Sequence, residues 1–238
     1  MTAQTPTNVP ERYVKALDDA EPLEVLRKMP KRLRRLLREA KSKELDWKAD
    51  PATWSVREIV GHLADNEFVF GARVRFVAAE ERPLLPAYDE KRFVAGLGLD
   101  RSSVEDLFDA WVAARAANLE MLRRLPESAW TRIGVHAERG ELSLAQIVIG
   151  AAGHDRVHEE QVERTLARAR AARRELKQRA KAEARSRKEE RPAKQKSAKR
   201  AGQAGAAREV ANGRKVEARS KETTASAKAA PPARTTTA

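Results

Sequence analysis

Two histidines lie four residues apart in the stretch GHDRVH, at positions 154 and 158 of the chain. In an α-helix, residues i and i+4 lie one turn apart on the same face. The two imidazoles could therefore bind one metal ion together, as the two histidines of the HExxH motif do in zinc proteases. Asp155 follows the first histidine here, so the catalytic glutamate of that motif is missing. A metal site at this pair needs a third ligand from elsewhere in the chain.

His62 is the candidate for that third ligand, because it lies on a mostly apolar stripe of another expected helix and so faces inward. Three histidine ligands leave at least one coordination position open, which suits a catalytic site better than a closed structural one. The alternative is that the three histidines are hydrogen-bonded core residues without a metal. The remaining histidine, His136, lies in a turn-rich segment and is expected to be exposed and uninvolved.

Several neighbours of these histidines are candidates for supporting roles. Asp65, one turn after His62, and Glu159, next to His158, could be carboxylates that orient imidazoles. They could equally be ordinary charges on helix surfaces. Three further residues are candidates for the surroundings of a pocket, without assigned roles: Trp54, Phe70 and Arg73.

Start and stop signals predict four main helices that position these residues. Residues 22–45 are apolar at helical spacing, with Pro30 as a break or kink. The other three helices begin at pairs typical of a capping box, in which each side chain bonds a backbone N–H of the first turn. These pairs are Ser55 with Glu58, Ser102 with Glu105, and Ser143 with Gln146. A short hairpin is expected around Arg139-Gly140, and strand signals are otherwise nearly absent. The sequence therefore predicts an all-α protein, most simply a four-helix bundle.

The net charge of the chain is concentrated at its C-terminal end. Residues 171–238 contain 20 Lys and Arg against 7 Asp and Glu, which accounts for the whole formal net charge of +13. This segment has no aromatic residue, so it cannot bury enough surface to offset its ordering entropy. The predicted organisation has four parts: a flexible N-terminus over 1–19, a bundle domain over 20–168, a charged helical extension over 169–191 and a disordered basic tail over 192–238.

The basic segment 171–238 would be attracted to phosphates, and without aromatic residues its contact with nucleic acid would be nonspecific. A solvated tail that keeps the chain soluble is the alternative. Membrane contact is not expected, because the tail has no apolar face and no apolar run approaches the length of a membrane span. The N-terminus lacks the basic and apolar regions of a secretory signal, so a cytoplasmic location is expected. The chain has no cysteine, which excludes disulfides, thiolate ligands and a cysteine nucleophile.

Two stretches make the chain resemble the DinB-like (DinB/YfiT) superfamily: WSVREIVGHLADNE at 54–67 and GELSLAQIVIGAAGHDRVHEEQVER at 140–164. The shared pattern is a Trp-Ser helix start, a histidine in HLAD and a closing HxxxH helix followed by a Gln, over roughly residues 20–168. The resemblance implies an antiparallel four-helix bundle that binds a divalent metal, commonly zinc or nickel, through three histidines. The family's ligand positions fall on His62, His154 and His158. The basic tail is not part of the family pattern.

The resemblance also implies a small-molecule substrate and a homodimer, which is common among relatives. Characterised members include S-transferases and isomerases that use bacillithiol, mycothiol or glutathione, and metal-dependent hydrolases. The leading hypothesis is therefore a metal-dependent S-transferase, in which a low-molecular-weight thiol cosubstrate attacks an electrophile, or a hydrolase. The alternative is a noncatalytic bundle scaffold whose basic tail binds nucleic acid nonspecifically.

Overall fold

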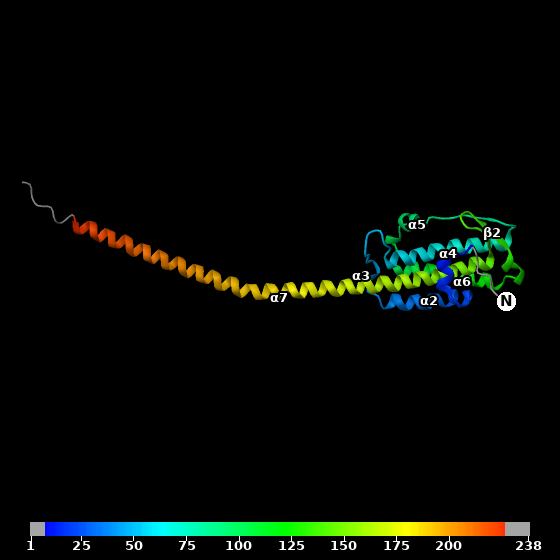
Figure 1. Ribbon diagram of the computed structural model, residues 1–238, viewed down its shortest axis with the longest axis horizontal. Coiled ribbons are helices and arrows are strands. Elements are labelled where there is room, and N and C mark those ends of the chain that lie inside the picture. Colours follow the sequence, from blue (N-terminus) through cyan, green and yellow to red (C-terminus); the bar gives the residue numbers. More distant parts are fainter. Residues whose placement is uncertain (1–7, 227–238) are drawn as a thin grey trace, which may run out of the picture. The chain divides into compact units, whose positions relative to one another are not determined.

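Four long helices pack side by side in the first of two units, which cover residues 1–174 and 175–238 (Figure 1). They are α2 (Pro22–Arg38), α4 (Val56–Ala79), α6 (Val104–Arg123) and the first part of α7 (Leu144–Ser226). The computed structural model describes residues 8–226, without the side chains of 189–199, 211, 213 and 216–226. The predicted all-α four-helix bundle is confirmed.

Local capping interactions fix where three of these helices begin. Two of the predicted capping boxes are present, with reciprocal bonds between side chain and backbone: Ser55 with Glu58 and Ser143 with Gln146. The third helix starts one residue later than predicted, since the Ser103 hydroxyl accepts the backbone N–H of Asp106 at 3.0 Å. This start places Val104, Phe108 and Trp111 on the buried face of α6.

Pro30 was predicted to break or kink the helix, and it does not break it, since α2 continues from Pro22 to Arg38. A proline inside a helix lacks the N–H that would bond the carbonyl four residues earlier. Here that carbonyl belongs to Leu26, and it accepts a hydrogen bond of 3.0 Å from the Arg115 guanidinium on α6. The interruption in the α2 backbone is therefore compensated by a side chain from another helix.

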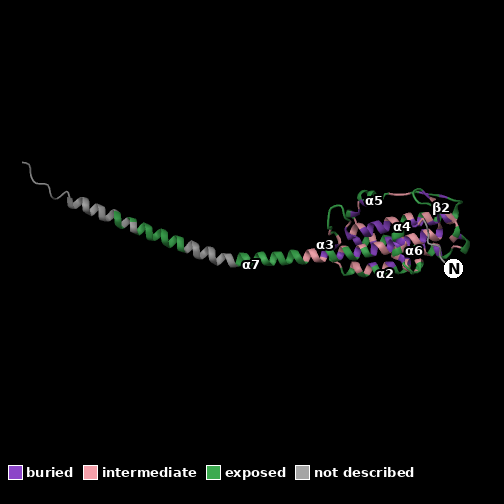
Figure 2. Cartoon of the chain, viewed as in Figure 1, coloured by how far each residue is buried: buried purple, intermediate pink, exposed green. Residues whose placement is uncertain are grey.

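Buried apolar side chains form two clusters, and Figure 2 shows the buried residues concentrated in the helices of the first unit. One cluster lies around the C-terminal half of α4 and the start of α7, and includes Phe70 and Ala152. The other lies around α2 and the N-terminal half of α4, and includes Ile59, Trp111 and Val162. Along α4, α6 and α7, most of the buried polar residues lie in the sequence between the residues of one apolar cluster and those of the other. They are Glu67, Arg115, Asn118, His154, Asp155, His158 and Glu159.

Within the predicted N-terminal segment 1–19, residues 11–17 form helix α1 (Glu11–Leu17). Val9, Tyr13 and Leu17 lie four residues apart and are buried in the first apolar cluster. A side chain at Gly153 would place its Cβ 2.2 Å from the carbonyl oxygen of Tyr13, so the glycine allows α1 to lie directly on α7. Residues 1–7 lie outside the described part of the chain.

A small sheet and short helices fill the connections. The predicted hairpin is confirmed: β2 (Ile133–His136) pairs antiparallel with β3 (Gly140–Ser143), and Gly140 takes a positive φ of 72° at the turn. β1 (Leu84–Leu85) pairs parallel with β2 on its other side. The short helices are α3 (Ser42–Leu45), α5 (Glu90–Gly96), η1 (Leu99–Arg101) and η2 (Glu127–Thr131).

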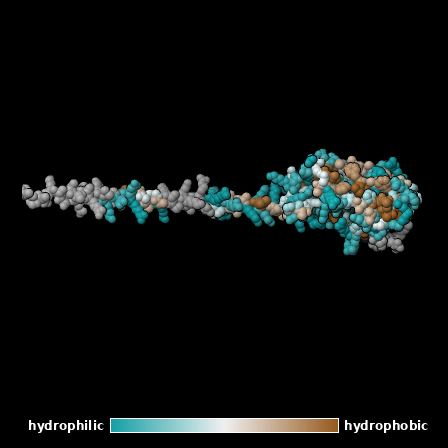
Figure 3. Space-filling model, turned by 90° about the horizontal axis from the view of Figure 1, so that it is seen from above, coloured by the Kyte–Doolittle hydropathy of each residue, from teal (hydrophilic) through white to brown (hydrophobic). Residues whose placement is uncertain are grey.

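The second unit contains the remainder of α7, which is described as far as Ser226. All side chains from 175 to 188 are exposed, and the described part of this helix is mostly hydrophilic (Figure 3). Helix α7 is described as far as Ser226, and its alanine, lysine, arginine and glutamate residues all favour helix. The predicted boundary of a disordered tail at residue 192 stays a prediction. Residues 227–238 of the predicted tail are not described. Among the described residues, no helix combines the length and apolarity needed to span a membrane.

Candidate metal centre

The three predicted ligands meet inside the bundle, where α4 carries His62 and α7 carries His154 and His158. One ligand atom from each lies within 4.8 Å of those of the other two, and all three side chains are buried. The Nε2 atoms of His62 and His154 are 2.9 Å apart. Nitrogen atoms this close together could bind one divalent ion jointly.

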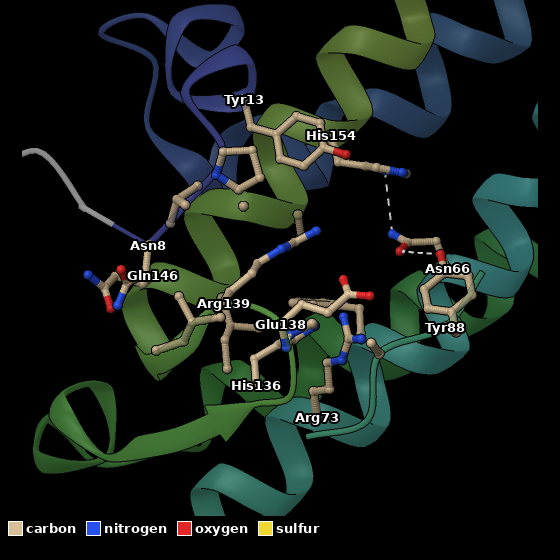
Figure 4. A pocket seen from close by; sticks show the side chains of 18 of the residues that line it. Asn8, Tyr13, Asn66, Arg73, Tyr88, His136, Glu138, Arg139, Gln146 and His154 are labelled. Carbon is tan, nitrogen blue, oxygen red and sulfur yellow. Dashed lines mark hydrogen bonds between the residues drawn. The ribbon is translucent and has the colours of Figure 1, made fainter. Parts of the chain in front are cut away.

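Neighbouring groups orient two of the imidazoles. The carboxamide oxygen of Gln161 accepts from Nδ1 of His158 at 2.7 Å, which puts the ring proton on Nδ1 and leaves the Nε2 lone pair free. On His154, Nδ1 lies 3.4 Å from the Asn66 amide, whose oxygen accepts from the Tyr88 hydroxyl at 2.9 Å (Figure 4). The His158–Gln161 bond has the sense typical of metal-ligating histidines, whose second ring N–H donates to an acceptor, whereas the Asn66 amide N–H donates towards Nδ1 of His154.

Two aromatic rings and one carboxylate complete the surroundings of the triad. The Trp54 ring packs against both His62 and His158, with centroids 4.9 and 6.3 Å apart. Tyr13 of α1 meets His154 edge-on at 5.6 Å. The Glu90 carboxylate lies 3.6 Å from Nε2 of His62 and is the acidic group at the triad.

Burial keeps the imidazoles neutral. It lowers the pKa of His62 to about 3, with a contribution from His158, and lowers the pKa of His158 to about 4. The pKa of His154 falls well below its ordinary value for the same reason. Neutral imidazole is the form that ligates metals. Nδ1 of His62 is buried without a hydrogen-bond partner. Three converging neutral nitrogen donors therefore fit a divalent transition metal.

A buried ion-pair network lies next to the triad and was not predicted. The Arg115 guanidinium on α6 donates to Glu67 of α4 at 2.7 Å and to Asp155 of α7 at 2.7 Å, in addition to its bond with Leu26. Asn118 donates to Glu67 as well, at 2.8 Å. Because Asp155 adjoins His154 in the sequence, this network fixes the rotation of α7 that points His154 inward. The sequence did contain a signal for this network, because Arg115 is a charged residue on the apolar stripe of α6.

Asp65 and Glu159, the carboxylates considered as partners of the imidazoles, form no hydrogen bond with a histidine in the described part of the chain. Glu159 is buried, but it pairs with Arg32 at 2.6 Å and Arg156 at 3.3 Å, and no hydrogen bond joins it to a histidine among the described residues. One carboxylate oxygen of Asp65 is buried without a partner, and burial raises the pKa of this group. Asn66 and Gln161 contact the imidazoles instead. Both side chains are uncharged amides, and only Gln161 had a signal in the sequence, as the Gln that follows the HxxxH pair in the family pattern.

A pocket of about 200 Å³ opens beside the triad and reaches His154 and Glu90 (Figure 4). Phe70 and Arg73 line it, as anticipated, whereas Trp54 packs on the histidine rings instead. His136 was expected to be exposed, and that prediction is wrong, because the residue is buried and lines the pocket. Strand β2 alternates its side chains between two faces, and this register turns His136 inward.

The fold and the site together define a histidine-triad four-helix bundle, and the comparisons agree with this class. A model of the DinB superfamily matches residues 26–162, and the chain belongs to that family. A protein of Oceanobacillus iheyensis named "Putative metal-dependent hydrolase" is 25% identical over 136 residues, which cover 55% of this chain and 75% of the relative. A second protein of that name, from Bacillus mycoides, is 28% identical over 133 residues, covering 50% of this chain and 77% of the relative. The structure of YfiT from Bacillus subtilis matches with a TM-score of 0.58 at 20% identity, over 71% of this chain and 91% of that one, and shares the fold.

The free energy of unfolding of the metal-free protein should fall as the pH drops from about 6.5 towards 4. The triad is neutral when folded down to about pH 4, while the same histidines protonate near pH 6.5 when unfolded. Each histidine that binds a proton only on unfolding contributes a slope of about 1.4 kcal/mol per pH unit. Asp155 acts in the opposite direction, since burial raises its pKa to about 6, but it is one group against three.

Urea denaturation of chelator-treated protein at pH 7.5, 6.0 and 5.0 measures this dependence. A variant with asparagine at all three triad positions should show a clearly shallower slope. Equal stability at the three pH values would contradict the assignment of three buried neutral imidazoles.

Proposed function

We propose that the chain is a metal-dependent enzyme that activates a nucleophile, water or a low-molecular-weight thiol, against a small electrophilic substrate. The observation that carries this proposal is the convergence of His62, His154 and His158 beside an open pocket. The names of the relatives, which designate metal-dependent hydrolases, support water as the nucleophile. A thiol would have to be a cosubstrate, because the chain has no cysteine.

The three histidines would hold a divalent ion such as zinc or nickel, and Gln161 and Asn66 would keep two of the rings in position. When bound, the ion supplies Lewis acidity, which makes a nucleophile available at neutral pH. Glu90 is placed to act as general base, because it lines the pocket and its carboxylate lies 3.6 Å from Nε2 of His62. It would accept the proton of the attacking water O–H or thiol S–H. The packed rings of Tyr13 and Trp54 limit the access of bulk water.

Elemental analysis of protein purified without an affinity tag tests the proposal most directly. We expect about one transition-metal ion per chain. Two reporter reactions then separate the nucleophiles: hydrolysis of p-nitrophenyl acetate, and conjugation of 1-chloro-2,4-dinitrobenzene with glutathione, bacillithiol or mycothiol. One of them should depend on the metal and stop when a chelator removes it. Protein without stoichiometric metal, or with neither reaction above background, would overturn the proposal.

The Glu90→Gln variant should keep its metal but react about 10²–10⁴-fold more slowly in the active reporter reaction, because the general base is lost. Glu81→Gln is the matched control, since Glu81 is an exposed carboxylate outside the pocket. Metal content and rate are measured on the same samples. A Glu90→Gln variant as fast as the control would exclude Glu90 as the base.

We also propose that the basic segment 171–238 contacts polyanions such as DNA. Two observations favour this: the segment carries the whole net charge of +13, and its side chains from 175 to 188 are exposed. The contact would be nonspecific, since no aromatic side chain is available to stack on bases. This contact and the chemistry of the triad do not exclude each other. The homodimer expected from the family resemblance also stays a prediction.

The densest basic block, RPAKQKSAKR at 191–200, provides the test in the full-length chain. Its five basic residues are changed to glutamine: Arg191, Lys194, Lys196, Lys199 and Arg200. We expect this variant to bind duplex DNA more weakly, and with a shallower dependence on salt, in fluorescence anisotropy at 50 and 200 mM NaCl, because each phosphate contact contributes about −0.9 to the slope.

The matched control changes five exposed basic residues of the bundle to glutamine: Lys15, Arg27, Lys28, Arg123 and Arg124. This control should bind DNA almost as well as the unaltered chain. Negligible binding by the unaltered chain at 50 mM NaCl, or an equal loss in both variants, would dismiss the polyanion proposal.

A further inference from the structure

We propose that the pocket beside the triad recognises an anionic group of the substrate, a carboxylate or a phosphate, through Arg73, Arg139 and His136. This inference rests on the proposed function only in taking the ligand to be the substrate of the triad. The anion would be held at one end of the pocket while the reacting bond lies next to His154. The proposal therefore assigns a substrate class: small molecules with a negatively charged group a short distance from an electrophilic centre.

The arginines at the pocket are the first observation behind this proposal. Arg12, Arg73 and Arg139 all line it, and none of them has an ion-pair partner within 4 Å in the described part of the chain. Arg32 and Arg115, by contrast, both form ion pairs with carboxylates. Cationic groups left without a counter-ion in a concave site favour a ligand that supplies the negative charge.

Arg73 is the central residue, because it has donors that the protein does not use. One terminal nitrogen donates to the Pro86 carbonyl at 2.6 Å, and the guanidinium lies 5.9 Å from the centre of the Tyr88 ring. These contacts hold the side chain at the pocket wall. Nε of Arg73 is buried without any hydrogen-bond partner. A planar guanidinium with an unused N–H is suited to bind a carboxylate or phosphate oxygen.

His136 contributes a third donor at the same end. Its Nδ1 accepts the backbone N–H of Glu138 at 3.2 Å, and burial together with Arg73 and Arg139 lowers its pKa. The ring is therefore neutral, with its single proton on Nε2. An imidazole N–H beside two guanidinium groups is a donor set suited to an oxyanion.

The carboxylates of the pocket divide between its two ends. Figure 4 shows Arg73, His136, Glu138 and Arg139 gathered at one end, and His154 with Asn66 towards the other. Glu90 lies at the triad, 3.6 Å from His62. Glu138 lies near Arg73 and Arg139 and would compete with a bound anion. Its single negative charge does not neutralise both guanidinium groups, so this end of the pocket keeps a net charge of +1. Removing the Glu138 carboxylate should therefore strengthen anion binding, which is a second testable effect.

Binding of small probes to the full-length protein tests the assignment without any enzymatic assay. Butyrate and n-butyl phosphate are compared with the neutral butanamide by isothermal titration calorimetry in 150 mM NaCl, on chelator-treated and on zinc-loaded protein. We expect at least one anion to bind tenfold or more tightly than butanamide in both forms. The preferred anion identifies the charged group as carboxylate or phosphate.

Variants localise the binding. Arg73→Gln should weaken the preferred anion tenfold or more, and so should Arg139→Gln, whose exposed position cannot disturb the core. Glu138→Gln should strengthen binding, because the competing carboxylate is removed. Arg123→Gln is the matched control: it loses the same charge on the outer surface of α6, and its affinity should not change. Circular dichroism verifies that each variant is folded.

Butanamide binding as tightly as both anions, or full affinity in both Arg73→Gln and Arg139→Gln, would overturn the anion site. These outcomes are independent of metal binding, since the chelator-treated protein is measured on its own. A chain that binds the anion but no metal would refute the proposed function and leave this inference standing. A chain that binds metal but not the anion would do the reverse.

Discussion

Replacing His154 by alanine should abolish stoichiometric metal binding. His154 contributes one of three nitrogen donors, and it lies 2.9 Å from His62 and one helical turn before His158. Loss of a group that merely orients a ligand typically costs 10–100-fold in metal affinity, so loss of a ligand should cost more. Elemental analysis and competition with a chromophoric chelator measure the change.

His136→Gln is the matched control for this experiment, because His136 is also a buried histidine but lies outside the triad. It should keep the metal content of the unaltered chain. If His154→Ala kept its metal at full stoichiometry, the triad would not be the metal site. Loss of metal in both variants would point instead to a general loss of structure, which circular dichroism reveals.

Replacing Arg115 by leucine should lower the free energy of unfolding by about 3–5 kcal/mol, as is usual when one partner of a buried ion pair is removed. The substitution leaves the carboxylates of Glu67 and Asp155 buried without their cation. It also removes the donor to the Leu26 carbonyl, which Pro30 has deprived of its helical partner. Urea denaturation at pH 7 measures the loss.

The control for Arg115→Leu is Arg123→Leu on the same helix, whose ion pair with Glu120 is exposed and should contribute little to stability. A chain with apolar residues at all three positions, 67, 115 and 155, should recover much of the lost stability, since no charge is then left buried and unpaired. Equal stability of Arg115→Leu and Arg123→Leu would show that the network does not hold the helices together.

Loss of the network should also weaken the metal site at a distance. Arg115 does not contact a histidine, but it binds the side chain of Asp155. Asp155 directly follows His154 in the chain, so a shift of Asp155 would also move His154. The packing of α4, α6 and α7 around this one guanidinium thus links the stability of the bundle to the geometry of the triad.

The sequence by itself determined the features that depend on local spacing. The 3.6-residue period placed His154 and His158 on one face, and the capping pairs at Ser55 and Ser143 set the start of the two helices that carry the triad. The inward stripe of α4 indicated His62. These features could be predicted because each of them is determined by residues within a few turns of one another.

The tertiary structure alone decided which distant segments meet at the site. The order of elements does not specify that Tyr13 covers His154, that Glu90 approaches His62, or that Arg73 and His136 share a pocket. The same holds for the Arg115 network, which joins four helices through pairs separated by 40 to 89 residues in the sequence. Such contacts depend on the packing of whole helices against each other, and no period or cap within a single helix records that packing.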